Sequence, residues 1–367
     1  MTSSLSSDSS AAIDGRAPIL AIESSCDDTA CAIMLPDGQI CADRIYSQNE
    51  HAALGGVVPE IAARAHLAHL PDLVSQCLSD AGYRLSDMGA FAATTGPGLI
   101  GGLIVGSHYA KGLALAMNRP FIAINHIEAH ALMATWPLML GGGAPFPFLL
   151  LLVSGGHCQC VAVRNIGDYT LLGGTIDDAA GEAFDKVAKM LGLGWPGGPA
   201  LEMLAREGDA RQWDFPRPLI GRAGCDFSFS GLKTAVSRVV SRFGAEALTR
   251  RDAANIAASF QASVARVMAD RVRNALSAFP EAKNIVVAGG VAANQAIRSS
   301  IEAVAQEGGL PLFVPPVRYC TDNAVMIAWT AWQKRRTHPA ADINDLNVAP
   351  RPRWPLDDMR PNHAAPG

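Results

Sequence analysis

The chain has 367 residues, of which 49% are hydrophobic and 17% are charged, and its formal net charge is −4. This length allows two lobes with separate cores, and the charge gives no overall attraction to nucleic acid or acidic membranes, so an RNA partner would need a local basic patch. No stretch reaches about 18 unbroken apolar residues, which predicts no membrane span. The eight cysteines form no C-x-x-C pair, which indicates reduced thiols in a cytoplasmic protein rather than a zinc cluster.

Residues 1–16 are rich in serine and poor in hydrophobic residues, which predicts a disordered tail. The next segment predicts three strands joined by a polar loop and a tight turn. The strands are expected at 18–22, 30–35 and 39–44. The polar loop between the first two contains Asp27 and Asp28, and it would suit a phosphate and its metal or be an ordinary polar hairpin.

A helix is expected over 59–80, with His66 and His69 as a polar or partner-facing pair. A strand over 90–95 leads into Gly96–Gly101, which matches the G-x-G-x-x-G dinucleotide pattern. The acidic residue expected about 20 positions further on is absent, which argues against a nicotinamide site.

Glycines recur every four residues at Gly98, Gly102 and Gly106. A helix face without side chains lets another helix approach closely. Such a face indicates either tight internal packing or a contact for a partner helix, and we favour the partner helix.

The stretch 120–134 runs from a strand into a helix. Asn125 stands at the N-cap position, and Glu128 follows three residues later as in a capping box, so we assign Glu128 to capping rather than to chemistry. His126 and His130 lie four residues apart on one helix face. That spacing suits two ligands of one metal ion, and it also suits two polar residues at a helix start.

A Gly- and Pro-rich stretch at 141–147 marks a lobe boundary. The opening pattern then recurs, with a polar loop over Ser154–His157. Its strands are expected at 149–153, 158–164 and 169–172. The repeat predicts a duplicated α/β protein with the layout of the actin, hexokinase and Hsp70 ATPase fold, in which two hairpin loops face an interlobe cleft.

We expect an N-terminal lobe over 17–140 that is completed by a helix over 322–337. A C-terminal lobe is expected over 146–321, followed by an extended Pro- and Arg-rich tail over 338–367. Within the second lobe we expect helices over 179–191, 252–277 and 295–306, a turn over 196–199, and strands over 283–288 and 312–315. Asp322, at the start of the closing helix, is the best candidate for a third metal ligand, and a plain N-cap aspartate is the rival interpretation.

Seven motifs occur in order between Leu20 and Trp332. They are Glu23-Ser-Ser-Cys-Asp27, Asn125-His126-x-Glu-x-His130, Leu152-Val-Ser-Gly-Gly-His157, Gly181-Glu-Ala-Phe-Asp185-Lys, Phe229-Ser-Gly-Leu-Lys-Thr234, Gly289-Gly-Val-Ala-Ala-Asn294 and Thr321-Asp322-Asn. In this combination the sequence resembles the TsaD family, the threonylcarbamoyl transferases of tRNA modification.

The resemblance implies that His126, His130 and Asp322 bind one divalent metal ion, iron or zinc. It also implies a set of residues that hold threonylcarbamoyl-AMP: Leu152, Val153, Ser154, Gly155, Gly156, Asp185, Gly198 and Asn294. Asp27 is the acidic candidate for catalysis. The family usually continues Asp-Glu, whereas this chain has Asp27-Asp28, which is one methylene shorter. Because acyl transfer from an activated anhydride needs no covalent nucleophile, we interpret Cys26 as structural.

The implied reaction transfers the threonylcarbamoyl group to N6 of the adenosine 3′ of the anticodon in tRNAs that read ANN codons, and AMP leaves. The implied partners are tRNA, a smaller paralogous TsaB-like subunit bound through a helical bundle, and a TsaE-like ATPase subunit. The basic residues between Arg206 and Arg251 are a candidate site for the tRNA backbone, so charge reversal at Lys233 and Arg238 should weaken tRNA binding.

Three alternatives belong to other functional classes. A metallopeptidase would want His-Glu-x-x-His, whereas Glu128 stands two residues after His126. A small-molecule kinase of the same fold would need no histidine pair. A non-enzymatic scaffold would need none of the three predicted ligands.

Overall fold

The computed structural model describes residues 16–48, 50–51, 56–139, 142–243, 248–338, 344 and 346–359. The predicted N-terminal tail, apart from Arg16, lies outside the described residues, as does the end of the predicted C-terminal tail. Within the described ranges no helix is both long enough and apolar enough to cross a bilayer.

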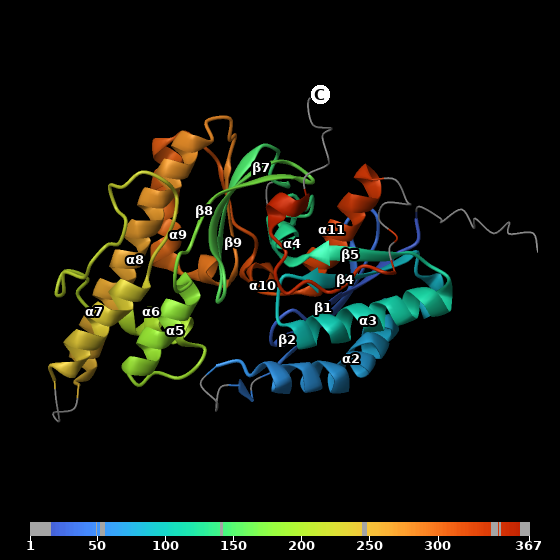
Figure 1. Ribbon diagram of the computed structural model, residues 1–367, viewed down its shortest axis with the longest axis horizontal. Coiled ribbons are helices and arrows are strands. Elements are labelled where there is room, and N and C mark those ends of the chain that lie inside the picture. The colour runs from blue at the N-terminus through green and yellow to red at the C-terminus, as the bar shows by residue number, and fades with distance from the viewer. Residues whose placement is uncertain are drawn as a thin grey trace, which may run out of the picture.

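Two five-stranded sheets form the centre of the molecule (Figure 1). The first has the order β3 (Ile40–Ser47), β2 (Asp28–Met34), β1 (Ile19–Glu23), β4 (Ala90–Gly96) and β5 (Phe121–Asn125). The second has the order β8 (Asp168–Gly174), β7 (Cys158–Asn165), β6 (Phe148–Val153), β9 (Ile285–Ala288) and β10 (Leu312–Phe313). In both sheets the first three strands pair antiparallel and the other two add in parallel. The predicted duplication is therefore confirmed.

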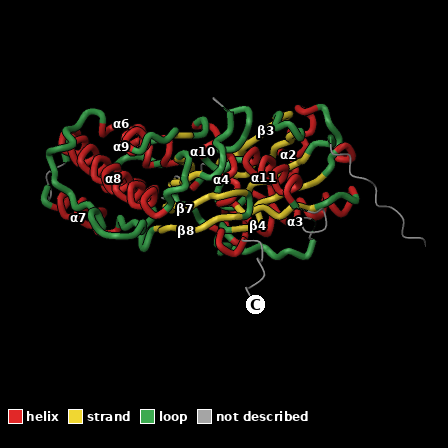
Figure 2. Tube along the Cα trace, turned by 90° about the horizontal axis from the view of Figure 1, so that it is seen from above, coloured by secondary structure: helices red, strands yellow, loops and turns green. Residues whose placement is uncertain are grey.

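Helices cover the sheets on both sides. The first sheet packs against α2 (Pro59–Ala81) and α3 (Ile100–Met117) on one face, and against α4 (His126–Met133) and α11 (Ala324–Thr337) on the other. Five helices accompany the second sheet: α5 (Ala180–Met190), α6 (Gly197–Ala205), α7 (Ser230–Ser241), α8 (Arg250–Ala278) and α9 (Gln295–Glu307). Figure 2 shows α6, α7, α8 and α9 at one end of the molecule and α2 and α3 toward the other end.

The strands at the centre of each sheet are uninterrupted apolar runs, because both of their faces are covered. Every residue of β1 and of β6 is buried. Such runs are typical of strands that lie between helix layers. The remaining described elements are the short helix α10 (Val317–Cys320) and three 3₁₀ turns, η1 (Leu85–Asp87), η2 (Gly290–Ala293) and η3 (Leu356–Met359).

Two local predictions in the second lobe are wrong. The predicted turn over 196–199 instead begins helix α6, which starts at Gly197 directly after Pro196. A proline just before the first helical residue is compatible with a helix start, because its missing N–H is not needed there. The strand expected over 312–315 covers only Leu312–Phe313, since prolines follow it.

The glycine-stepped face of α3 does not contact a partner helix but the loop between β1 and β2 of the same chain. A Cβ atom on Gly106 would lie 2.0 Å from Ser24 Oγ, and one on Gly102 would lie 2.2 Å from the Ser24 carbonyl oxygen. Ser24 Oγ also donates a hydrogen bond to the Gly102 carbonyl, at 3.0 Å. Our interpretation of these glycines as a partner contact is therefore wrong, and they let α3 support the first hairpin loop instead.

Glu128 does not form the predicted capping box. Asn125 caps α4 as expected, because its Oδ1 accepts hydrogen bonds from the amides of Ile127 and Glu128. The buried Glu128 carboxylate instead accepts a hydrogen bond from the hydroxyl of Tyr169 on β8, at 2.9 Å, and lies 3.5 Å from Lys334 Nζ on α11. Glu128 therefore links α4, next to the first sheet, to a strand of the second sheet.

Loss of the Tyr169 hydroxyl should destabilise this link. Tyr169→Phe removes a donor from a buried carboxylate, and such a loss costs about 1–3 kcal/mol in the free energy of unfolding. Thermal or urea unfolding measures the effect. The matched control is Tyr83→Phe, since the Tyr83 hydroxyl has no hydrogen bond to any described side chain or backbone group. Equal unfolding free energies for the two variants would contradict a stabilising role of the link.

Residues 346–359 run along the surface from the first sheet to the second. The Arg351 amide donates to the Thr95 carbonyl at 2.7 Å, and the Asn125 side chain donates to the Trp354 carbonyl at 2.9 Å. At the far end, the Leu171 amide of β8 donates to Asp357 and Leu356 is buried. The described part of the predicted tail therefore packs against both sheets. It also occupies the glycine turn after β4, where Gly98 donates to the Pro352 carbonyl.

Candidate metal and substrate site

The three predicted metal ligands converge between the two sheets. His126 and His130 stand on one face of α4 with ring centroids 4.7 Å apart, and Asp322 comes from the loop before α11. The Asp322 Oδ1 atom lies 3.4 Å from His126 Nε2 and 3.2 Å from His130 Nε2. One ligand atom from each residue falls within 4.8 Å of the others. Two imidazole nitrogens and one carboxylate oxygen form a donor set that suits zinc or iron.

Asp322 is not the N-cap of the closing helix. Asn323 caps α11, because its side-chain oxygen accepts a hydrogen bond from the Met326 amide at 2.9 Å. The rival interpretation of Asp322 as a plain cap is therefore wrong, and its carboxylate is available to face the two histidines.

The carboxylates of Asp322 and Glu23 balance a positive charge on His126. Burial opposes a charge on His126, yet Asp322 and Glu23 together raise the pKa of His126 to about 10. Burial would likewise raise the pKa of Asp322, but the two histidines outweigh it and hold the pKa well below its ordinary value. In the metal-free protein His126 is therefore protonated near neutral pH, and a metal ion must displace that proton.

Glu23 orients the His126 ring through its Nδ1 atom. Its fully buried carboxylate lies 3.2 Å from His126 Nδ1 and accepts hydrogen bonds from the Ser25 amide and the Thr94 hydroxyl. The ring therefore keeps Nε2 turned toward Asp322 and His130. A carboxylate behind a ligating histidine fixes its tautomer and raises its basicity. Glu23 stands in one of the sequence motifs, but nothing nearby in the sequence identifies the partner of a buried acid.

Glu23→Gln should weaken metal binding by about 10–100-fold, because the variant loses the negative charge that supports His126. Competition with a chromophoric chelator measures the affinity. Glu281→Gln is the control, since Glu281 is a half-exposed carboxylate paired with Arg164 on the other lobe. A folded Glu23→Gln protein with wild-type metal affinity would show that the orientation by Glu23 is unimportant.

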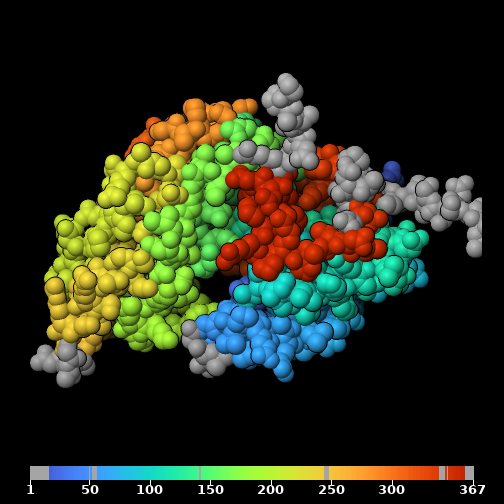
Figure 3. Space-filling view, viewed as in Figure 1, coloured from blue at the N-terminus to red at the C-terminus, as the bar shows by residue number. Residues whose placement is uncertain are grey.

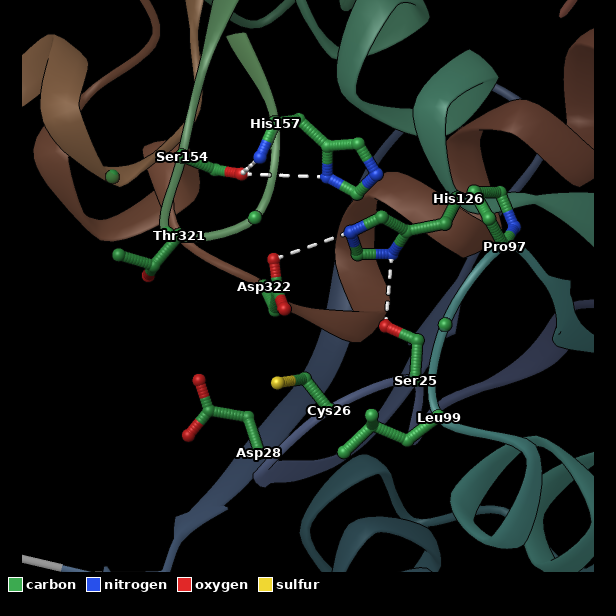
Figure 4. Close-up of a pocket in the computed structure, with 14 residues that line it drawn as sticks. Ser25, Cys26, Asp28, Pro97, Leu99, His126, Ser154, His157, Thr321 and Asp322 are labelled. Atoms are coloured by element: carbon green, nitrogen blue, oxygen red, sulfur yellow. Dashed lines mark hydrogen bonds and ion pairs between the residues drawn. The ribbon is translucent and has the colours of Figure 1, made fainter. Parts of the chain in front are cut away.

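A cleft opens beside the three ligands (Figure 3). It consists of two adjoining cavities of 340 and 880 Å³, and Cys26, Gly155 and Gly156 line both. The smaller cavity is bounded by the loop after β1, by Pro97–Leu99, by the loop after β6 and by Asp322 (Figure 4). The larger cavity extends along α5 past Asp185 to Trp195. These volumes fall in the range of small-molecule sites, about 300–1,000 Å³.

The structure brings only some of the predicted substrate residues to this cleft. Ser154, Gly155 and Gly156 line it, and so does Asp185, whose Oδ1 accepts a hydrogen bond from the Gly197 amide. The other four do not line either cavity: Leu152, Val153, Gly198 and Asn294.

Two of these four are strand residues and one is a helix cap. Leu152 and Val153 are fully buried in β6, so only their backbone groups could serve a ligand. Asn294 caps α9 through the Ile297 amide and donates to Gln261 at 2.8 Å. Its amide keeps a second N–H and a second lone pair beyond these two bonds.

The first hairpin loop presents Asp28, rather than Asp27, to the smaller cavity (Figure 4). Burial raises the pKa of Asp28 to about 7, and the carboxylates of Asp322 and Asp27 add to this rise against a hydrogen bond with Ser47. A carboxylate that changes protonation near neutral pH can accept a proton during a reaction. Asp27 lines neither cavity.

Two further residues line the cleft, although the sequence alone gives little indication that they do. His157 lines the smaller cavity, and burial together with the neighbouring His126 lowers the pKa of His157 to about 4, so its ring is neutral at pH 7. Cys26 lines both cavities, but burial and the nearby Asp27 raise the pKa of its thiol far above the ordinary range. The thiol is therefore a poor nucleophile, in agreement with a structural role.

A metallopeptidase mechanism conflicts with the position of Glu128. Its carboxylate is buried, bonded to Tyr169 and absent from the lining of both cavities. It cannot activate a water for attack on a peptide in the cleft.

Residues 39–329 match the protein family described as tRNA N6-adenosine threonylcarbamoyltransferase. Among curated proteins of that same name, the chain is 61% identical to one from Gluconobacter oxydans, over 94% of either chain. It is 58% identical to one from Granulibacter bethesdensis, over 93% of this chain and 94% of the relative.

Solved structures with low sequence identity share the fold. HypF from T. kodakarensis superposes with a TM-score of 0.59 at 15% identity, over 88% of this chain and 48% of HypF. Component A of the (R)-2-hydroxyglutaryl-CoA dehydratase from Acidaminococcus fermentans gives a TM-score of 0.51 at 18% identity, over 87% of this chain and 99% of that protein. The predicted actin/hexokinase/Hsp70-like ATPase fold is confirmed.

Proposed function

The chain belongs to the family of tRNA N6-adenosine threonylcarbamoyltransferases, and on this premise we propose how its interlobe cleft carries out the transfer. The enzyme moves a threonylcarbamoyl group from threonylcarbamoyl-AMP to N6 of an adenosine, the one 3′ of the anticodon in tRNAs that read ANN codons. The observation that carries the proposal is the combination of the three convergent ligands with a cleft of adenylate size beside them.

The donor lies along the two cavities in this proposal. The Ser154-Gly155-Gly156 loop is free of large side chains and lines both cavities, so it suits the phosphate and the carbonyl. Asp185 lines the larger cavity and suits a ribose hydroxyl. Asn294 stays a prediction for the base end, and Gly198 stays a predicted contact of the donor, since neither residue lines a cavity.

His126, His130 and Asp322 would hold one divalent metal, with iron favoured and zinc possible. A metal bound there supplies a positive charge for phosphate or carboxylate oxygens of the donor. Glu23 holds the His126 ring in place through its Nδ1 atom.

The chemical step is an acyl transfer. The N6 amine attacks the carbamoyl carbon, the bond from that carbon to the phosphate oxygen breaks, AMP leaves, and N6 gives up one proton. Because the donor is already an activated anhydride, the residues of the cleft mainly position both substrates and accept this proton. We assign the proton to Asp28, which faces the cavity and has a pKa of about 7, while Asp27 stays the alternative predicted from the sequence.

A smaller paralogous subunit is proposed to bind the outer face of α2 and α3. Large apolar side chains are exposed on this helix pair at Ile61, Leu67, Ile100, Ile104 and Leu115. This face differs from the glycine-stepped face that the sequence suggested. The ATPase subunit stays a prediction from the family resemblance, and a cytoplasmic location stays a prediction from the cysteine pattern.

Leu67→Asp should abolish that complex, because a charge would be buried at the centre of an apolar contact. Size-exclusion chromatography with light scattering measures the complex. Leu138→Asp is a matched control, since Leu138 is 58% exposed, compared with 66% for Leu67, and belongs to neither helix. An intact complex with Leu67→Asp would place the partner elsewhere.

The transfer itself is tested with the purified full chain, threonylcarbamoyl-AMP or its synthase with ATP, bicarbonate and threonine, the partner subunits and unmodified tRNA. We expect the adenosine to gain the mass of one threonylcarbamoyl group in a nucleoside digest. A tRNA that lacks this adenosine should stay unmodified. No mass gain with folded, metal-loaded protein would contradict the function.

A further inference from the structure

Two cavities adjoin each other on the C-terminal lobe, away from the cleft. One has a volume of 260 Å³ and lies between the segment 210–217 and α8, and the other has 280 Å³ and lies between the same segment and α7. Trp213 and Asp214 line both. We call this pair of cavities the Trp213 groove. It lies at the end of the molecule where α7 and α8 are found (Figures 1 and 2).

The Trp213 groove is strongly basic in a chain whose net charge is −4. One carboxylate, that of Asp214, faces five guanidinium groups, and these belong to Arg211, Arg217, Arg238, Arg242 and Arg266. Arg217 pairs with Asp214, and Arg211 lies 3.5 Å from Asp209. Within the described ranges the other three are exposed and have no acidic partner.

Other basic residues of the same stretch are already engaged. Lys233 Nζ lies 2.9 Å from Asp178 Oδ2, and Arg250 lies 2.7 Å from Glu207. Charge reversal at Lys233, the test suggested by the sequence, would therefore break an internal ion pair. The available charge is concentrated at Arg238, Arg242 and Arg266.

The segment that carries Trp213 is fastened to α8. The Trp213 amide donates to Ser259 Oγ at 3.2 Å, and the Asp209 amide donates to Asn255 Oδ1 at 2.8 Å. The indole is half-buried between the two helices and lines both cavities. These hydrogen bonds hold the segment in place, so that the Trp213 side chain lies between two groups of arginines.

We propose that the Trp213 groove binds the sugar–phosphate backbone of the tRNA, with the indole offered to an unstacked base. This inference rests on the proposed function. Guanidinium groups bind phosphates through two parallel hydrogen bonds, and aromatic rings next to such groups stack bases in single-stranded and looped RNA. A negatively charged enzyme that acts on tRNA needs such a local patch.

The test combines Arg238→Gln, Arg242→Gln and Arg266→Gln in the full chain and measures binding of unmodified tRNA across a salt series. Each phosphate contact contributes about 0.7–0.9 to the slope of log K against log salt. We therefore expect the slope to fall by about 2–3 and the Kd at physiological salt to rise by about 10–100-fold. Trp213→Leu should weaken binding with an unchanged slope, because stacking releases no counterions.

The matched control removes three arginines of the other lobe, through Arg44→Gln, Arg64→Gln and Arg84→Gln, so both variants have the same net charge. These three form exposed ion pairs with Asp80, Glu60 and Asp87. Equal losses of affinity in the two triple variants, or wild-type binding by the groove variant, would overturn the proposal. So would an unchanged tRNA affinity with lost binding of a poly-glutamate peptide, which would indicate an acidic protein partner.

The transfer rate at saturating tRNA separates this proposal from the proposed function. We expect the groove variant to keep that rate and to need more tRNA to reach it. A lower rate at saturation would overturn a pure binding role. A wild-type chain that binds tRNA but never modifies it would contradict the function alone, and the salt slopes would still decide whether the groove binds RNA.

Discussion

Alanine at His126 is expected to remove the bound metal and to reduce threonylcarbamoyl transfer to the background rate. Loss of an outer partner of a metal ligand already costs about 10–100-fold in affinity, so loss of one of three ligands should exceed 100-fold. Metal analysis after gel filtration measures the loss, and the nucleoside assay measures the transfer. His130→Ala should behave in the same way, since its Nε2 atom lies 3.2 Å from the same Asp322 oxygen.

His338→Ala is the control for these variants, because His338 follows α11 and its ring bonds only to Thr337 and Lys334 among the described residues. It should keep both metal and activity. Calorimetry of metal binding in buffers of different ionisation enthalpy should also show the release of about one proton near neutral pH, because His126 has a pKa of about 10 without metal. Transfer that proceeds normally in metal-free His126→Ala protein would rule out the metal site.

Asp28→Asn is expected to reduce the transfer rate by about 10²–10⁴-fold at saturating substrates, the range for loss of a general base. The asparagine keeps the size of the side chain and its place at the cavity, but it cannot accept the N6 proton. In the wild type the base must be deprotonated, so the rate should increase with pH through the raised pKa of Asp28 and then level off. In Asp28→Asn this increase should be lost.

Asp27→Asn distinguishes the two neighbouring acids. Asp27 lines neither cavity, so its replacement should have the smaller effect on the rate and should preserve the pH profile. The reverse result, with a normal rate in Asp28→Asn and a large loss in Asp27→Asn, would return the role to the residue predicted from the sequence. Single-turnover measurements keep product release out of the comparison.

The fold and half of the site follow from local pattern. The repeated order of strand, polar loop and strand predicted both sheets, because buried strands appear in the sequence as short apolar runs. The spacing of His126 and His130 predicted a pair on one helix face, and the structure places them so. Asp322 is almost 200 residues away in the sequence. Its position before a helix and the family resemblance predicted it as the third ligand, and it lies beside the two histidines.

The wrong predictions for Glu128 and for the glycines of α3 share one physical cause, which is a partner distant in the sequence. A capping box explained Glu128 within four residues, but the carboxylate gains more from Tyr169 on another sheet. The glycines of α3 correctly indicated a close neighbour, yet spacing cannot say that this neighbour is Ser24. Asp27 and Asp28 are adjacent acids in one loop, and only the course of β2 decides which side chain faces the cavity.

The packing of α11 on the first sheet has a consequence for synthesis on the ribosome. The last strand of that sheet ends at Asn125, but the helix that covers its inner face begins only at Ala324. At about 5–20 residues per second, the ribosome needs ~10–40 s to make the ~200 residues in between. The second sheet, by contrast, is complete at Phe313. Apolar surface on the inner face of the first sheet therefore stays uncovered by α11 until almost all of the second lobe has been made.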